Sequence, residues 1–150
     1  MSLKVRIDAD LKTAQLSRDS FLVEVLRGLK STILNEEIAK GKRDEGLSDE
    51  AIEQLLQKEV KKRDESAELF ERGGNQESAK KELAEKEIIQ KYLPEQLSEA
   101  ELTVIVEKAI AETGASNLKE MGQVIGKVRA EVGSKGDGSL IAKIAKEKLT

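Results

Sequence analysis

Carboxylates, lysines and arginines are the residues that could carry chemistry in this 150-residue chain, because it contains no histidine and no cysteine. Histidine-based nucleophilic triads, thiolate nucleophiles and the usual zinc sites are therefore excluded. The phosphate loop GxxxxGK[ST] and the dinucleotide fingerprint GxGxxG are also absent from the sequence. General acid or base catalysis by a carboxylate needs a shifted pKa in a pocket, and no pattern marks one. We predict no catalytic residue, no metal site and no cofactor.

A glycine-rich segment near the C-terminus comes nearest to a phosphate-binding loop. It runs from Gly133 to Ser139, contains Lys135 and leads into a predicted helix. Its backbone N–H groups and the lysine could hold a phosphate. We favour a connection between two helices with Asp137 as the N-cap, because that carboxylate occupies the donors an anion would need.

Two glycines, Gly122 and Gly126, lie four residues apart within a helical pattern and therefore share one helix face. Each costs about 1 kcal/mol relative to alanine, so a compensating gain is expected. We favour close approach of a neighbouring helix. Close approach to a ligand or nucleic-acid backbone is the alternative, and the flanking Lys119, Lys127 and Arg129 keep it open.

Charge is unevenly distributed along the chain. The net charge is −3, but from Ala115 onward seven lysines and arginines outnumber four carboxylates. Such an asymmetry indicates an anionic partner for the C-terminal part. Aromatic residues make up 2% of the chain, which argues against recognition by base stacking. The candidate RNA contacts are Lys119, Lys127, Arg129, Lys135, Lys143 and Lys146.

A second group of basic residues is Lys58, Lys61, Lys62 and Arg63. These residues are interleaved with carboxylates, which favours a mixed solvated surface over a phosphate-binding stripe. The spacing of Glu59 and Arg63 predicts an i,i+4 pair.

The N-terminal part is predicted to form long helices. Apolar residues recur at three- and four-residue spacing from Leu22 to Ile33. A long helix is expected from an N-cap at Ser48 to Gly73-Gly74, with Phe70 on its apolar stripe. The next helix, from about Asn75 to Tyr92, carries Leu83, Ile88 and Ile89 on its apolar positions.

Pro94, the only proline, should end that helix and begin the C-terminal part. Ser98 and Glu101 match a capping box, and Gly114 is a predicted C-cap. Ser116 is the expected cap of the next helix, and Asp137 that of the last. The middle helix is expected to bury Leu118, Met121, Ile125, Val128 and Val132.

The chain is therefore predicted to be all-α, with two helical lobes. Residues 1–93 form a lobe of long helices, and residues 94–150 form a small three-helix bundle. No apolar run is long enough for a secretion signal or a membrane span, so we expect no membrane association and a cytoplasmic location.

Several segments together resemble the YqeY-like proteins, which are related to the C-terminal tail of GatB, the B subunit of the aspartyl/glutamyl-tRNA amidotransferase. The most specific is Tyr92-Leu93-Pro94-Glu95-Gln96-Leu97-Ser98-Glu99-Ala100-Glu101-Leu102. The others are Gly114-Ala115-Ser116, Met121-Gly122-Gln123-Val124-Ile125-Gly126 and Lys135-Gly136-Asp137-Gly138. The likeness extends upstream through residues 26–30, 35–38, 60–66 and the position of Phe70, so it covers nearly the whole chain.

This resemblance implies an all-helical two-lobe fold and kinship with a module that contacts tRNA in the amidotransferase, where other domains perform the chemistry. The family carries a label of carbon–nitrogen ligase activity with glutamine as amido-N-donor. Two positions depart from the family pattern: Ile125 replaces a usual methionine, and Lys135 replaces a usual arginine. A lysine keeps the charge but loses the bidentate geometry of arginine.

Our leading hypothesis is a stand-alone, non-catalytic module that binds tRNA or another structured RNA through a basic C-terminal lobe. The first alternative is a protein-interaction adaptor in which the acidic N-terminal lobe docks on a separate enzyme. The second is direct participation in glutamine-dependent amide formation.

Overall fold

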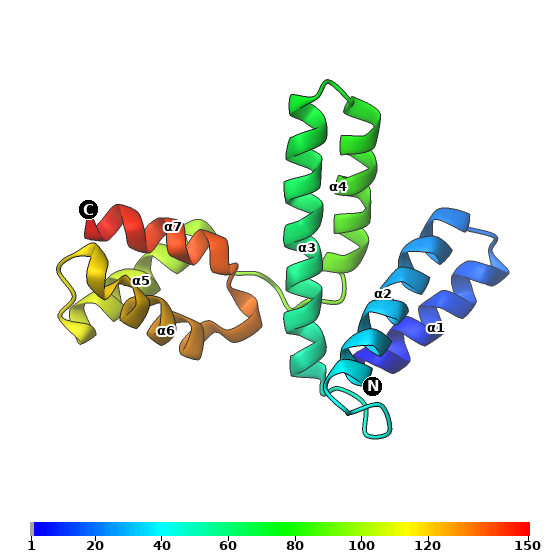
Figure 1. Ribbon diagram of the computed structural model, residues 1–150, viewed down its shortest axis with the longest axis horizontal. Coiled ribbons are helices and arrows are strands. Elements are labelled where there is room, and N and C mark those ends of the chain that lie inside the picture. Colours follow the sequence, from blue (N-terminus) through cyan, green and yellow to red (C-terminus); the bar gives the residue numbers. More distant parts are fainter. Residues whose placement is uncertain (1) are drawn as a thin grey trace. The chain divides into compact units, whose positions relative to one another are not determined.

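The computed structural model describes residues 2–150, and these residues form helices and no strand (Figure 1). The predicted all-α class, with long N-terminal helices and a C-terminal three-helix bundle, is confirmed. No helix in the described range is long and apolar enough to cross a membrane. The α-helices are α1 (Leu3–Leu16), α2 (Ser20–Ala39), α3 (Asp49–Arg72), α4 (Gln76–Gln90), α5 (Glu99–Thr113), α6 (Met121–Val132) and α7 (Gly138–Leu149), and two 3₁₀ turns are η1 (Leu118–Glu120) and η2 (Gly133–Lys135).

The chain folds as two compact units, Met1–Leu93 and Pro94–Thr150. In the first unit, α1 pairs with α2, and α3 forms a long hairpin with α4 (Figure 1). One face of each helix enters a common core, because apolar residues at three- and four-residue spacing fall on one side of a helix. That core includes Leu26, Leu29, Ile52, Leu56 and Ile89, each at most 1% exposed.

Both ends of α3 and the start of α4 are where the local signals predict them, whereas α4 ends at Gln90, two residues before the predicted Tyr92. Ser48 accepts a hydrogen bond from the N–H of Ala51, Gly73 is the C-cap of α3, and Asn75 caps α4. The apolar stripes are less completely buried than expected. Phe70 and Leu83 remain 37% and 38% exposed, whereas the small residues Ala67 and Ala79 are buried.

Glu37, near the end of α2, is a buried carboxylate at 1% exposure. Lys4 Nζ on α1 lies 3.0 and 3.1 Å from its two oxygens, and the N–H of Leu47 donates to it at 3.0 Å. Burial raises the pKa of Glu37, but these hydrogen bonds and the charge of Lys4 outweigh burial and hold the pKa below its ordinary value. Glu37 thus ties together α1, α2 and the loop that leads to α3.

Tyr92 closes the N-terminal unit. Its ring is 6% exposed, its hydroxyl donates to Asp10 on α1, and the guanidinium of Arg6 lies 5.3 Å from the ring centroid. Burial, reinforced by Asp10, raises the pKa of the hydroxyl well above its ordinary value. Tyr92, two residues before Pro94, therefore fixes the end of this unit against α1.

The second unit is a three-helix bundle in which α5, α6 and α7 all contact one another. Its core includes Leu102, Val106, Val124, Val128 and Ile141, each 0% exposed. Ser98 accepts a hydrogen bond from the N–H of Glu101 at 3.1 Å, as the capping box predicts. The Glu101 carboxylate accepts from the Ser98 hydroxyl, whereas the capping box predicts that it accepts from the Ser98 backbone N–H. Gly114 ends α5 in the left-handed region, with φ of 71°.

Two predictions for the middle helix of this bundle are wrong. Asn117, not Ser116, provides the cap, and it caps the 3₁₀ turn η1 that precedes α6. Leu118 is 45% exposed, whereas Val124 is fully buried. The 3₁₀ turn changes the angular register before Met121, so the buried stripe of α6 is Val124, Val128 and Val132 rather than a line that starts at Leu118.

Glu37→Gln is expected to lower the free energy of unfolding by about 2 kcal/mol at pH 7, because it removes the charge that pairs with Lys4 in a buried setting. The carboxylate contributes stability above its ordinary pKa of 4.5, and this contribution is lost as the pH falls through the lower folded-state value. The difference between wild type and variant should therefore shrink as the pH falls below 4.5. Urea unfolding at a series of acidic pH values measures this difference in unfolding free energy, and a difference that stays constant as the pH falls below 4.5 to the acid limit of folding would contradict this role.

Candidate nucleic-acid interface

Gly122 and Gly126 lie on the outward face of α6. Both are exposed, and a Cβ built on either would meet nothing within 4 Å. The favoured interpretation, close approach of a neighbouring helix, is therefore wrong for the described chain. What the two glycines leave is a smooth stretch of exposed helix surface, and approach of a ligand or nucleic-acid backbone remains the open alternative.

Cationic side chains stand on both sides of this glycine face. By helical spacing, Lys127 lies toward one edge of the face and Arg129 toward the other. Lys127 Nζ forms an ion pair with Glu112 of α5 at 2.6 Å, while the Arg129 guanidinium packs against Gly138 at the start of α7. Arg129 is therefore held over the α6–α7 junction, and Lys127 is held toward α5.

Ion pairing with α5 divides the lysines of the bundle into two groups. Lys127 pairs with Glu112, and Lys148 Nζ lies 2.9 Å from Glu107. The hydrogen bond and charge of Lys127 lower the pKa of Glu112. The remaining candidates are exposed and have no ion pair within 4.0 Å among residues 2–150: Lys119, Lys135, Lys143 and Lys146.

The positive charge belongs to α6 and α7 rather than to the whole C-terminal lobe. Counted over residues 94–150, eight lysines and arginines stand against nine carboxylates. Four of these carboxylates are on α5, at Glu99, Glu101, Glu107 and Glu112. The description of this lobe as basic is therefore wrong for the unit as a whole and holds for the segment after Ala115.

The glycine-rich segment before α7 connects α6 to α7 and provides the N-cap of α7. Asp137 accepts from the N–H of Ser139 at 2.9 Å and caps α7, as predicted. Gly136 is the glycine that the packing requires, because a Cβ there would lie 2.7 Å from Val132 Cγ2. Sequence reasoning missed Gly136, since the contact depends on the fold of η2. Leu97 and Gln96 also donate to backbone oxygens of η2, at Lys135 and Ser134.

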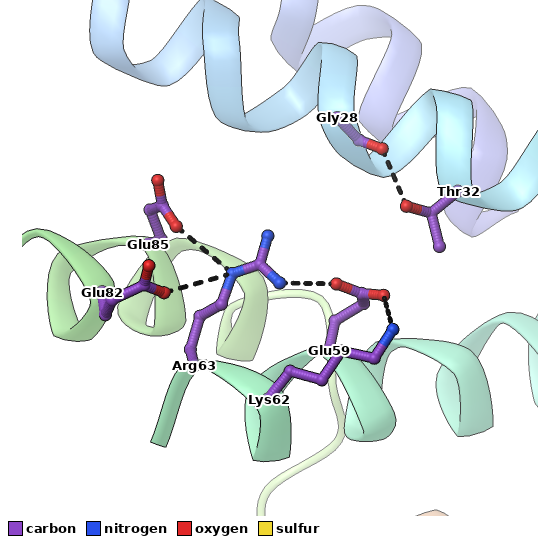
Figure 2. A network of polar contacts seen from close by, with 7 residues as sticks. All are labelled: Gly28, Thr32, Glu59, Lys62, Arg63, Glu82 and Glu85. Atoms are coloured by element: carbon purple, nitrogen blue, oxygen red, sulfur yellow. Dashed lines mark hydrogen bonds and ion pairs between the residues drawn. The ribbon is translucent and has the colours of Figure 1, made fainter. Parts of the chain in front are cut away.

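The basic cluster of α3 takes part in a polar network within the N-terminal unit (Figure 2). Arg63 Nη1 donates to Glu59 at 2.6 Å, which confirms the predicted i,i+4 pair. Its Nε also reaches Glu85 and Glu82 of α4, at 3.2 and 3.9 Å, a link that helical spacing within α3 could not predict (Figure 2). Arg63 is thus engaged by carboxylates and is a poor candidate for phosphate binding.

Within residues 2–150, no three histidine, cysteine, aspartate or glutamate side chains are grouped so that they could hold a metal ion. The grouped polar side chains described above are ion pairs between helices. The exposed face of α6 and α7 is therefore the strongest candidate site.

Comparison with known proteins supports the resemblance noted in the sequence. The family model described as Yqey-like protein matches residues 4–149, nearly the full length of the chain. The chain belongs to the YqeY-like family. All the predicted RNA contacts and both glycines lie within the matched region.

Two curated fungal relatives carry the name "Altered inheritance of mitochondria protein 41, mitochondrial". The protein from Lachancea thermotolerans is 35% identical over 111 residues, covering 72% of this chain and 58% of the relative. The protein from Pyrenophora tritici-repentis is 27% identical over 145 residues, covering 95% and 78%. The chain thus spans little more than half of the first relative. Because these relatives are named mitochondrial, the cytoplasmic location stays a prediction.

Replacing Gly122 and Gly126 with alanine should stabilise the protein. Neither glycine has a positive φ, and both positions have room for a methyl group. Each substitution is therefore expected to raise the free energy of unfolding by about 0.5–1 kcal/mol. Chemical denaturation of both single variants measures this, and a loss of stability would show that the α6 face is more crowded than described.

Arg63→Met should destabilise the N-terminal unit by about 2 kcal/mol, because it leaves the buried Glu59 with only its longer contact to Lys62, at 3.3 Å. Adding Glu59→Gln should recover part of that loss, since the buried charge that has lost its shorter ion pair is then removed. Urea unfolding of both single variants and the double variant gives the coupling energy. Strictly additive effects would contradict the network in Figure 2.

Proposed function

We propose that this YqeY-like protein binds structured RNA, with tRNA as the foremost candidate, through the outward face of α6 and α7. The observation that carries the proposal is the exposed glycine pair of α6 beside cations that the bundle itself does not neutralise. Glycines in a helix cost stability, and nothing within the described chain compensates for Gly122 and Gly126.

Recognition would take place through phosphates and shape. An A-form helix presents phosphates and 2′-hydroxyls to a protein more readily than base edges, and point charges suffice to contact phosphates. Lys119, Lys135, Lys143 and Lys146 supply such charges, and Arg129 adds a guanidinium at the α6–α7 junction. The glycines let a sugar–phosphate backbone approach the helix closely between them.

The carboxylates of α5 supply a reason for the orientation of this interface. Two of them form ion pairs with Lys127 and Lys148, and all of them would repel phosphates, so RNA would bind away from α5. The candidate RNA contacts are thereby narrowed to Lys119, Arg129, Lys135, Lys143 and Lys146. Lys127 lies at the edge of the proposed interface. The resemblance to the tail of the amidotransferase B subunit supports the same partner class.

In this proposal the chain is a binding module, and the family label of carbon–nitrogen ligase activity describes chemistry performed by another protein. The site offers cations and a smooth helix face, which suit positioning of RNA. Glutaminase or transamidation activity from the purified chain alone would contradict this part of the proposal.

Replacing Lys135, Lys143 and Lys146 together with alanine should weaken tRNA binding at least about tenfold and reduce the slope of log K against log salt by about one per lost contact. The control replaces Lys80, Lys81 and Lys91, which are exposed in the N-terminal unit and give the same change in net charge. Filter binding across a salt series compares the two. Undetectable binding by the wild type at low salt, or equal losses in both variants, would contradict the proposal.

A further inference from the structure

A groove between α1 and α2 lies wholly within the N-terminal unit and shares no residue with the proposed RNA-binding face. Its volume is about 490 Å³, and its apolar lining comes from Ile7 and Leu11 on α1 and from Ile33 and Leu34 on α2. Ile7 and Ile33 form a buried floor at 0% and 2% exposure, whereas Leu34 is 40% exposed. Ile38 lies one turn beyond Leu34 on α2 and is 55% exposed, so the apolar surface continues past the groove.

The rim of the groove is cationic, with Lys4, Arg27 and Lys30 among its lining residues. Arg27 is exposed and has no ion pair among residues 2–150. Lys30 is 45% exposed beside Asp8, at 2.8 Å. The carboxylate of Glu37 also lines the groove, but it is buried and saturated by Lys4 and Leu47, so it presents little charge outward.

Lys4 and Lys30 are each paired with a carboxylate, so the positive charge that the rim presents outward comes mainly from Arg27. Residues 1–93 contain eighteen lysines and arginines against twenty carboxylates, so a basic rim is not a consequence of overall composition. An apolar floor between cationic rims is complementary to a ligand with an apolar face and acidic flanks.

The dimensions of the groove favour a short helix. Lining residues run from Lys4 to Leu11 on α1 and from Arg27 to Glu37 on α2. At 1.5 Å per residue these spans are about 10 and 15 Å, which corresponds to two or three helical turns. We propose that this groove binds an acidic amphipathic helix of a partner protein, with Leu34 as the apolar anchor beside the buried floor and Arg27 as the main charge contact.

Two other occupants fit the groove less well. A stable dimer buries about 800 Å² per subunit, which is more than the exposed apolar area of Leu34, Ile38 and their neighbours can supply. A lipid surface needs protruding apolar side chains, whereas the floor here is recessed. This inference does not depend on RNA binding, because the groove and the α6–α7 face belong to different units.

The test uses two fluorescein-labelled, 15-residue helical peptides with leucines at i, i+3, i+4 and i+7. One carries glutamates beside the leucines, and the other carries lysines at the same positions. Fluorescence anisotropy with the full chain should show binding of the acidic peptide at least about tenfold tighter than of the basic one, with a marked loss at high salt.

Leu34→Glu and Arg27→Glu should each weaken the acidic peptide at least about tenfold, whereas Leu69→Glu, at a 66% exposed position on α3, should not. Both groove residues are exposed, so the variants should fold, and circular dichroism checks this. Equal binding of the two peptides, no effect of Leu34→Glu, a dimer in light scattering that Leu34→Glu dissociates, or binding of anionic vesicles without peptide binding would each overturn the proposal.

Discussion

The C-terminal unit depends on one packing constraint: each of three short helices must bury its single apolar face against the other two. In α6 that requirement places Val124, Val128 and Val132 inside, and it leaves Gly122 and Gly126 outside. In α7 it buries Ile141, Ile144 and Leu149 and leaves Lys143 and Lys146 exposed. The proposed RNA-binding face is therefore the surface that stays exposed once the apolar faces of the three helices are buried.

Electrostatics then selects among the exposed cations. The acidic helix α5 forms ion pairs with Lys127 and Lys148, whereas the lysines of η1 and η2 and the other two lysines of α7 have no such pair among the described residues. A count of charges along the sequence treats all of these lysines alike. The structure separates them because ion pairs such as Lys127 with Glu112 join residues fifteen positions apart on different helices.

Local signals predicted much of the fold, since caps and breakers act within a few residues. Ser48, Ser98, Asp137 and Gly114 all have the roles that their types indicate. The sequence pattern gave no bounds for α1, although Leu3, Ile7, Leu11 and Ala14 are spaced as one buried face. Features that depend on two elements meeting could not be predicted: the link from Arg63 to α4, the burial of Glu37, the tight packing of Gly136 and the open surroundings of Gly122.

The most direct test of the account is an amide chemical-shift map of the full chain, recorded by NMR during titration with unmodified tRNA at low salt. The largest changes are expected on Gly122, Gly126 and Arg129 and on Lys135, Lys143 and Lys146, and they should diminish as salt is added. Changes confined to residues 1–93, or none at all, would contradict it.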